Sequence, residues 1–86
     1  MHTVELREQA LALARQLGYQ VRQEWIGGNG GGPCEFAGRK WIFVDLALNA
    51  AEQLDQIAEA LRKEPAIQTL TLTPPLRNLL GIRRSA

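Results

Sequence analysis

The chain has 86 residues, of which 45% are hydrophobic and 22% are charged. This composition is typical of one small globular domain and excludes a wholly disordered chain. The formal net charge of +1 excludes a polybasic nucleic-acid binder. One cysteine and one histidine exclude an internal disulfide and a zinc finger built from a single chain.

The apolar runs and the N-terminal segment predict a cytoplasmic protein. No apolar run approaches the ~18–20 residues that a membrane span needs. Glu5, Arg7 and Glu8 interrupt the first apolar pattern, which is unlike a signal peptide. A lone Cys34 would be tolerated as a free thiol in the cytoplasm.

The first segment predicts an amphipathic helix from Thr3 to Leu17. Its apolar residues recur at spacings of three and four and define one face: Leu6, Ala10, Leu13, Ala14 and Leu17. Gly18 suits the end of this helix because it accepts positive φ without a steric penalty.

A strand and a glycine-rich loop are predicted to follow this helix. The strand runs from Tyr19 to Ile26, with polar residues at alternate positions on one face. Trp25, just before the loop, is a candidate for a contact surface. Residues 27–32 contain five glycines, which predicts a segment with high backbone freedom.

The next strands are predicted to form a hairpin over residues 34–37 and 40–46. A two-residue turn at Gly38-Arg39 would pair Phe36 with Trp41 and Cys34 with Phe43. One face then carries Cys34, Phe36, Trp41, Phe43 and Asp45, and the other carries Glu35, Ala37, Lys40, Ile42, Val44 and Leu46. Because the second hairpin strand is apolar on both faces, we expect it to be central and covered on both sides.

The second half of the chain predicts a helix, a strand and a short tail. The helix runs from Asn49 to about Lys63, with Asn49 and Glu52 spaced as a capping box. The alternation over Ile67–Thr73 predicts an edge strand, which Pro74-Pro75 ends. Four apolar residues favour one or two helical turns in the tail: Leu76, Leu79, Leu80 and Ile82.

The predicted fold class is α+β in the order α-β-β-β-α-β. It is a twisted mixed sheet of about four strands, packed with two main helices and followed by a short helical C-terminal tail. Strands three and four are expected to be parallel, with a right-handed crossover. The whole chain, residues 1–86, forms a single domain, with a core over residues 1–73 and a basic tail rich in leucine and arginine over residues 74–86.

The stretch from Gln9 to Leu61 resembles the minimal core of the restriction-endonuclease-like superfamily, most closely small bacterial proteins of the YraN type. The resemblance rests on Leu17-Gly18-Tyr19, then Gly31-Gly32-Pro33-Cys34-Glu35-Phe36, then Phe43-Val44-Asp45-Leu46-Ala47. It implies the same order of elements and a metal-dependent nuclease site at the end of the third strand.

The resemblance also implies that most of this catalytic site is missing. Asp45 matches the second acidic ligand of the family, whereas Cys34 replaces its first metal-binding aspartate and Ala47 replaces its catalytic lysine. Such nucleases hold Mg²⁺ with two carboxylates, and a thiolate is a poor ligand for this hard cation. Asp45 and Glu35 remain the candidate metal ligands, although the predicted register places them on opposite faces of the sheet. A purely structural alternative for Asp45 is to accept hydrogen bonds from nearby backbone N–H groups or to pair with an arginine.

Two further groups of residues are candidate binding sites. The loop residues Gly28, Asn29, Gly30 and Gly31 could bind an anion or ligand through backbone N–H groups, and the alternative is a flexible connector. Arg77, Arg83 and Arg84 give the tail a charge of +3 and could contact nucleic acid. The alternative for the tail is that its leucines pack on the body of the protein or on a second copy.

These features favour a non-catalytic interaction or binding module with no cofactor. One form of this hypothesis is a homodimer, formed through a sheet edge or through the leucine-bearing tail. The main alternative is a metal-dependent nucleic-acid hydrolase with a degenerate site, which alone would need Mg²⁺. Another alternative is a non-catalytic nucleic-acid binder.

Overall fold

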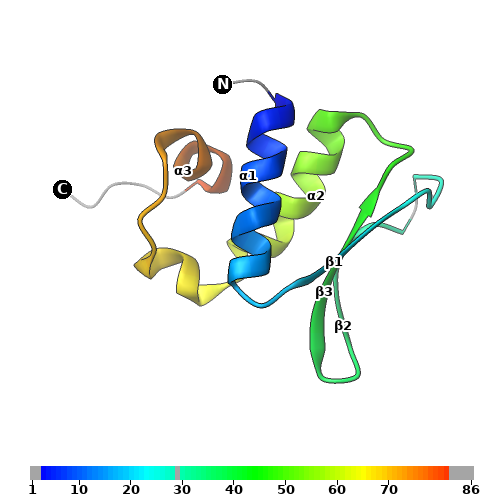
Figure 1. Ribbon diagram of the computed structural model, residues 1–86, viewed down its shortest axis with the longest axis horizontal. Coiled ribbons are helices and arrows are strands. Elements are labelled where there is room, and N and C mark those ends of the chain that lie inside the picture. The colour runs from blue at the N-terminus through cyan, green and yellow to red at the C-terminus, as the bar shows by residue number, and fades with distance from the viewer. Residues whose placement is uncertain (1–2, 29, 82–86) are drawn as a thin grey trace.

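The computed structural model describes residues 3–28 and 30–81 (Figure 1). The elements in chain order are α1 (Thr3–Gln16), β1 (Gln20–Glu24), β2 (Gly32–Phe36), β3 (Arg39–Asp45), α2 (Ala50–Arg62), the 3₁₀ helix η1 (Pro65–Thr69) and α3 (Pro74–Leu80). The α+β class and the first five elements were predicted correctly. No helix in the described ranges is long and apolar enough to cross a bilayer.

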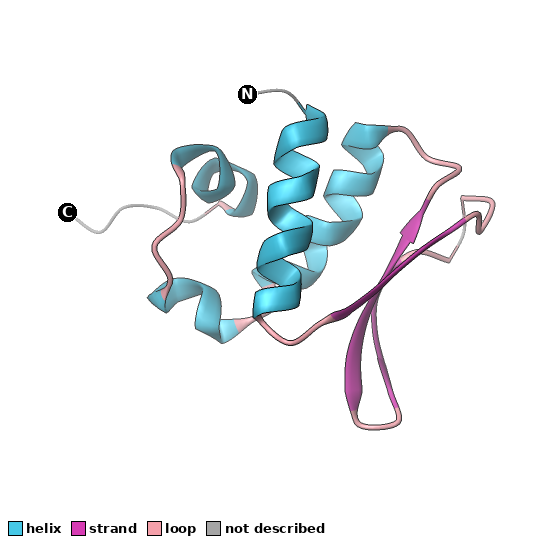
Figure 2. Cartoon of the chain, in the orientation of Figure 1, coloured by secondary structure: helices cyan, strands magenta, loops and turns pink. Residues whose placement is uncertain are grey.

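The elements form two layers, a layer of helices and a mixed sheet (Figures 1 and 2). The sheet has three strands in the order β1-β3-β2. β3 pairs with β1 in parallel and with β2 in antiparallel orientation. The helices pack on one face of the sheet, and no described element covers the other face (Figure 1).

The helix α2 begins where the sequence predicts it. Asn49 is the N-cap, and its side chain accepts a hydrogen bond of 2.8 Å from the backbone N–H of Glu52. The Glu52 carboxylate in turn accepts from the backbone N–H of Asn49 at 3.1 Å, which completes the capping box.

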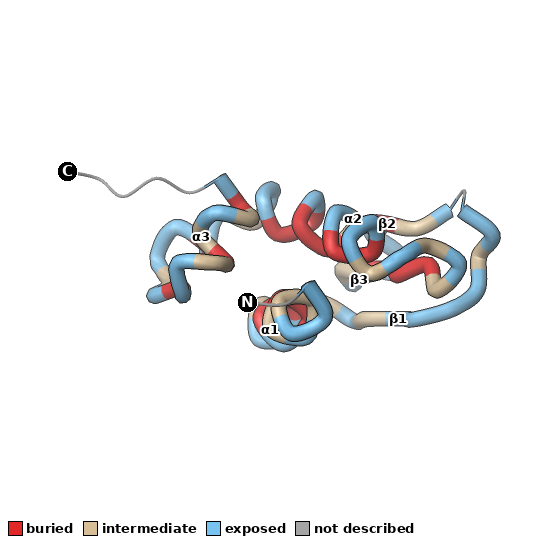
Figure 3. The backbone as a smooth tube through the Cα atoms, turned by 90° about the horizontal axis from the view of Figure 1, so that it is seen from above, coloured by how far each residue is buried: buried red, intermediate tan, exposed pale blue. Residues whose placement is uncertain are grey.

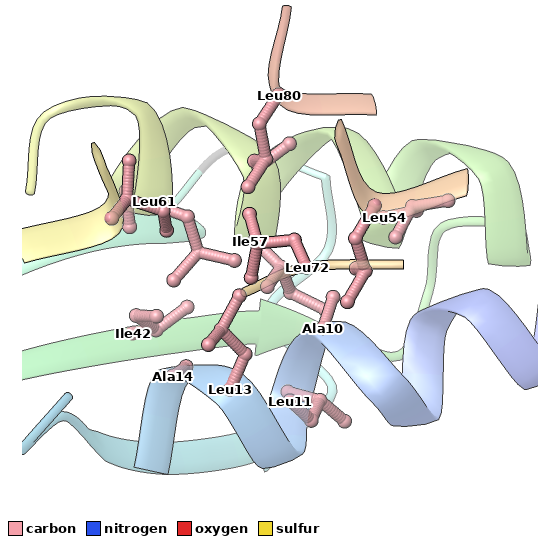
Figure 4. Close-up of a cluster of buried hydrophobic side chains, with 14 of the residues drawn as sticks. Ala10, Leu11, Leu13, Ala14, Ile42, Leu54, Ile57, Leu61, Leu72 and Leu80 are labelled. Carbon is pink, nitrogen blue, oxygen red and sulfur yellow. The ribbon is translucent and has the colours of Figure 1, made fainter. Parts of the chain in front are cut away.

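The core lies between α1, α2 and the helix-facing side of β3. Alanines on the two helices, Ala10, Ala14 and Ala58, are fully buried and leave little side-chain bulk where α1 and α2 meet. The larger residues of this core include Leu11, Leu13, Ile42, Leu54, Ile57, Leu61, Leu72 and Leu80 (Figure 4). Buried residues occur along α2 and β3, whereas β1 is exposed along most of its length (Figure 3).

The hairpin register differs from the prediction by two residues. Phe36 pairs with Arg39 and Cys34 with Trp41, so the turn is Ala37-Gly38 rather than Gly38-Arg39. Both turn residues have positive φ, 54° and 77°, as in a type I′ hairpin turn. A shift of two residues preserves the period of the strand, so every side chain stays on its predicted face.

The predicted fourth strand over residues 67–73 is wrong. Pro65 begins the 3₁₀ helix η1 there, and no strand of the described chain pairs with residues 70–73. Ile67 and Leu72 are buried and Leu70 is partly buried, all of them packed into the helical core. The apolar alternation over residues 67–73 therefore arises from packing against helices and not from pairing in a sheet. The expected parallel pairing of strands three and four is also wrong, because the parallel pair is β1 and β3.

Candidate functional site

The most distinctive surface is the open side of the sheet, which carries a hollow of about 350 Å³. Five residues line the hollow, and we call them the aromatic face: Arg22, Cys34, Phe36, Trp41 and Phe43. They come from all three strands. Their side chains share one side of the sheet because alternate residues of a strand point the same way. The helices pack on the other side, against Ile42 and Val44.

The aromatic rings of this face are exposed or only partly buried. Trp41 and Phe43, two residues apart on β3, stack with ring centroids 5.9 Å apart and an interplanar angle of 16°. The side chain of Phe36 is 69% exposed. The indole Nε1–H of Trp41 is buried and has no hydrogen-bond partner in the described chain. The expectation that β3 is covered on both sides is therefore wrong for the described chain, because helices cover one side only.

Three charged residues lie next to these rings, because the exposed Arg39 pairs with Phe36 on the same side of the sheet as Arg22 and Glu24. Arg22 lies opposite Phe43 in the strand pairing, and its guanidinium forms an exposed ion pair of 2.6 Å with Glu24. Cys34 is exposed. Trp25, which follows β1, is 77% exposed but does not line the hollow. The face is therefore apolar at its centre, with a pair of opposite charges along β1 and the cation Arg39 at its hairpin end.

Asp45, the candidate metal ligand, is fully buried at the end of β3. Its carboxylate accepts hydrogen bonds from the backbone N–H groups of Ala47 at 2.9 Å, Ile26 at 3.0 Å and Gly28. Burial raises the pKa of this carboxyl, but the backbone N–H donors outweigh burial and hold the pKa below its ordinary value. The prediction that Asp45 accepts hydrogen bonds from nearby backbone N–H groups is therefore confirmed. These bonds connect the end of β3 to the segment that follows β1.

The glycine-rich segment fits closely around this buried carboxylate. Gly28 donates to Asp45 with φ at +93°, a backbone conformation that L side chains rarely adopt. At Gly31, a Cβ atom would clash with the side-chain amide of Gln56. The Oε1 atom of Gln56 accepts from the backbone N–H of Asp45 at 3.0 Å. Gly28 and Gly31 therefore serve the packing around Asp45. Gly30 is exposed, and Asn29 lies outside the described residues.

The structure does not bring Glu35 and Asp45 together. Glu35 pairs with Lys40, near the hairpin turn, whereas Asp45 is the last residue of β3. The two residues also point to opposite faces of the sheet. Within residues 3–28 and 30–81, no group of three or more histidine, cysteine, aspartate or glutamate residues is arranged to hold a metal ion.

Glu35 lines a second cleft, of about 410 Å³, on the helix side of the hairpin. Lys40 Nζ forms an ion pair of 2.7 Å with Glu64, donates to the carbonyl of Leu17 at 3.2 Å and lies 4.6 Å from the ring centroid of Tyr19. The hydrogen bond between Lys40 and Glu64 raises the pKa of Lys40 and lowers the pKa of Glu64. Burial raises the pKa of Tyr19. The raised pKa of Lys40 keeps its amine protonated, and the raised pKa of Tyr19 keeps its phenol protonated, so neither side chain is activated as a nucleophile here.

The arginines proposed to contact nucleic acid are only partly described. Arg77 is in the last turn of α3 and is half-buried, on a helix distant from the sheet (Figure 1). Arg83 and Arg84 lie outside the described residues. The proposed role of the three arginines stays a prediction.

Sequence reasoning missed two features of the structure. The open aromatic face was missed because its residues alternate along their strands as core residues do. A polar network centred on Arg7 was also missed, in which its guanidinium donates to Gln53 at 2.7 Å and to Gln23 at 2.5 Å. No spacing rule could have found these contacts, because they join residues 16 and 46 positions apart.

A scan against protein-family models and searches of curated proteins and of solved structures found no match to this chain. The resemblance to the restriction-endonuclease-like superfamily therefore stays a prediction.

Proposed function

We propose that this protein is a non-catalytic binding module whose binding surface is the aromatic face. The observation that carries the proposal is the 69% exposure of Phe36 beside the stacked pair of Trp41 and Phe43. Contiguous aromatic surface exposed to water is costly and marks contact sites on small proteins. Aromatic residues and arginine are also the residue types enriched in protein interfaces.

Hydrolysis at Asp45 is the less well supported alternative. A metal-binding carboxylate needs free oxygen lone pairs, but this carboxylate already accepts three backbone hydrogen bonds. Recruiting a metal would leave at least some of these backbone N–H groups without their acceptor, which costs free energy. Glu35 is too far along the sheet to act as the second ligand.

Binding of the apolar fluorophore anilinonaphthalene sulfonate to the native protein tests the proposal. We expect enhanced dye fluorescence well below the unfolding transition, because the aromatic face offers an apolar hollow open to solvent. Phe36→Ser should remove most of the enhancement while circular dichroism stays unchanged, since Phe36 contributes little to the core.

The control for this experiment is Val4→Ser, which removes an apolar side chain that is 59% exposed on α1. This variant should keep the dye signal. Native protein that does not enhance the dye, or enhancement that survives Phe36→Ser, would contradict the proposed binding surface.

A further inference from the structure

We draw no further inference here: the strongest candidate, the aromatic face on the open side of the sheet, belongs to the site already described, and nothing in the structure of the described residues shows what covers it.

Discussion

At the scale of single residues, Asp45 shows how a buried charge can be structural. It is a fully buried carboxylate in the described chain, and the donors around it are backbone N–H groups from two separate segments. Accepting several N–H bonds stabilises the charged form and lowers the pKa below the ordinary 3.8, against the effect of burial. The acidic residue that resembles a nuclease ligand thus holds the loop and the sheet together.

The lowered pKa of Asp45 predicts how stability depends on pH. A carboxyl whose pKa is lower in the folded than in the unfolded state stabilises the fold above the unfolded pKa, and this contribution is lost as the pH falls through the folded pKa. We expect Asp45→Asn to unfold more easily at pH 7, because its Nδ2 cannot accept the N–H bonds. Between pH 7 and pH 3, the variant should also lose less stability than the wild type does.

Urea unfolding followed by circular dichroism at several pH values measures both effects. The matched control is Asp55→Asn, which changes an exposed carboxylate on α2 and should keep the acid sensitivity of the wild type. The same acid dependence in Asp45→Asn and in the wild type would contradict the role assigned to the buried carboxylate.

At the scale of secondary structure, elements with local end signals were predicted best. The helix α2 has an N-cap, a capping partner three residues later and a proline after its end, all visible in sequence. Residues 67–73 carry an apolar alternation that suits either a sheet or a helical core. The sequence pattern alone could not distinguish a strand from a segment packed on helices, because the outcome depends on which surface lies beside Leu70 and Leu72.

The capping box of α2 supports a quantitative prediction. Asn49→Ala should lower the free energy of unfolding by about 1 kcal/mol, because the N–H of Glu52 loses its acceptor. Asn49→Ser keeps a side-chain acceptor and should cost much less. Chemical denaturation at neutral pH measures the difference, and equal stability of the alanine and serine variants would show that the cap contributes little.

At the scale of the whole molecule, one side chain connects elements that are distant in sequence. Arg7 on α1 is 13% exposed at its side chain and donates to Gln53 of α2 and to Gln23 of β1. Gln53 is itself buried, and its side-chain Nε2 donates a hydrogen bond of 2.8 Å to the carbonyl of Leu48. The network links both main helices to the sheet by polar contacts.

Replacing this arginine tests the network. Arg7→Met retains most of the side-chain volume but leaves the Oε1 atom of buried Gln53 without its donor. We expect a loss of about 1–3 kcal/mol in the free energy of unfolding. The exposed Arg15 on the same helix provides the control, and Arg15→Met should change stability by less than about 0.5 kcal/mol. Equal effects of the two substitutions would show that the network is not needed for stability.

The sequence alone determined the α+β class, both main helices, the capping box and the face on which each hairpin side chain lies. These features depend on periodicity and on groups within a few residues of each other, so they can be inferred without knowing the fold. Only the tertiary structure decided that the sheet has three strands, that Asp45 is enclosed by backbone donors and that the aromatic face is open. Each of these depends on which distant segments meet. The apolar pattern of β3 shows that both of its faces favour burial, but it cannot show which surface covers them.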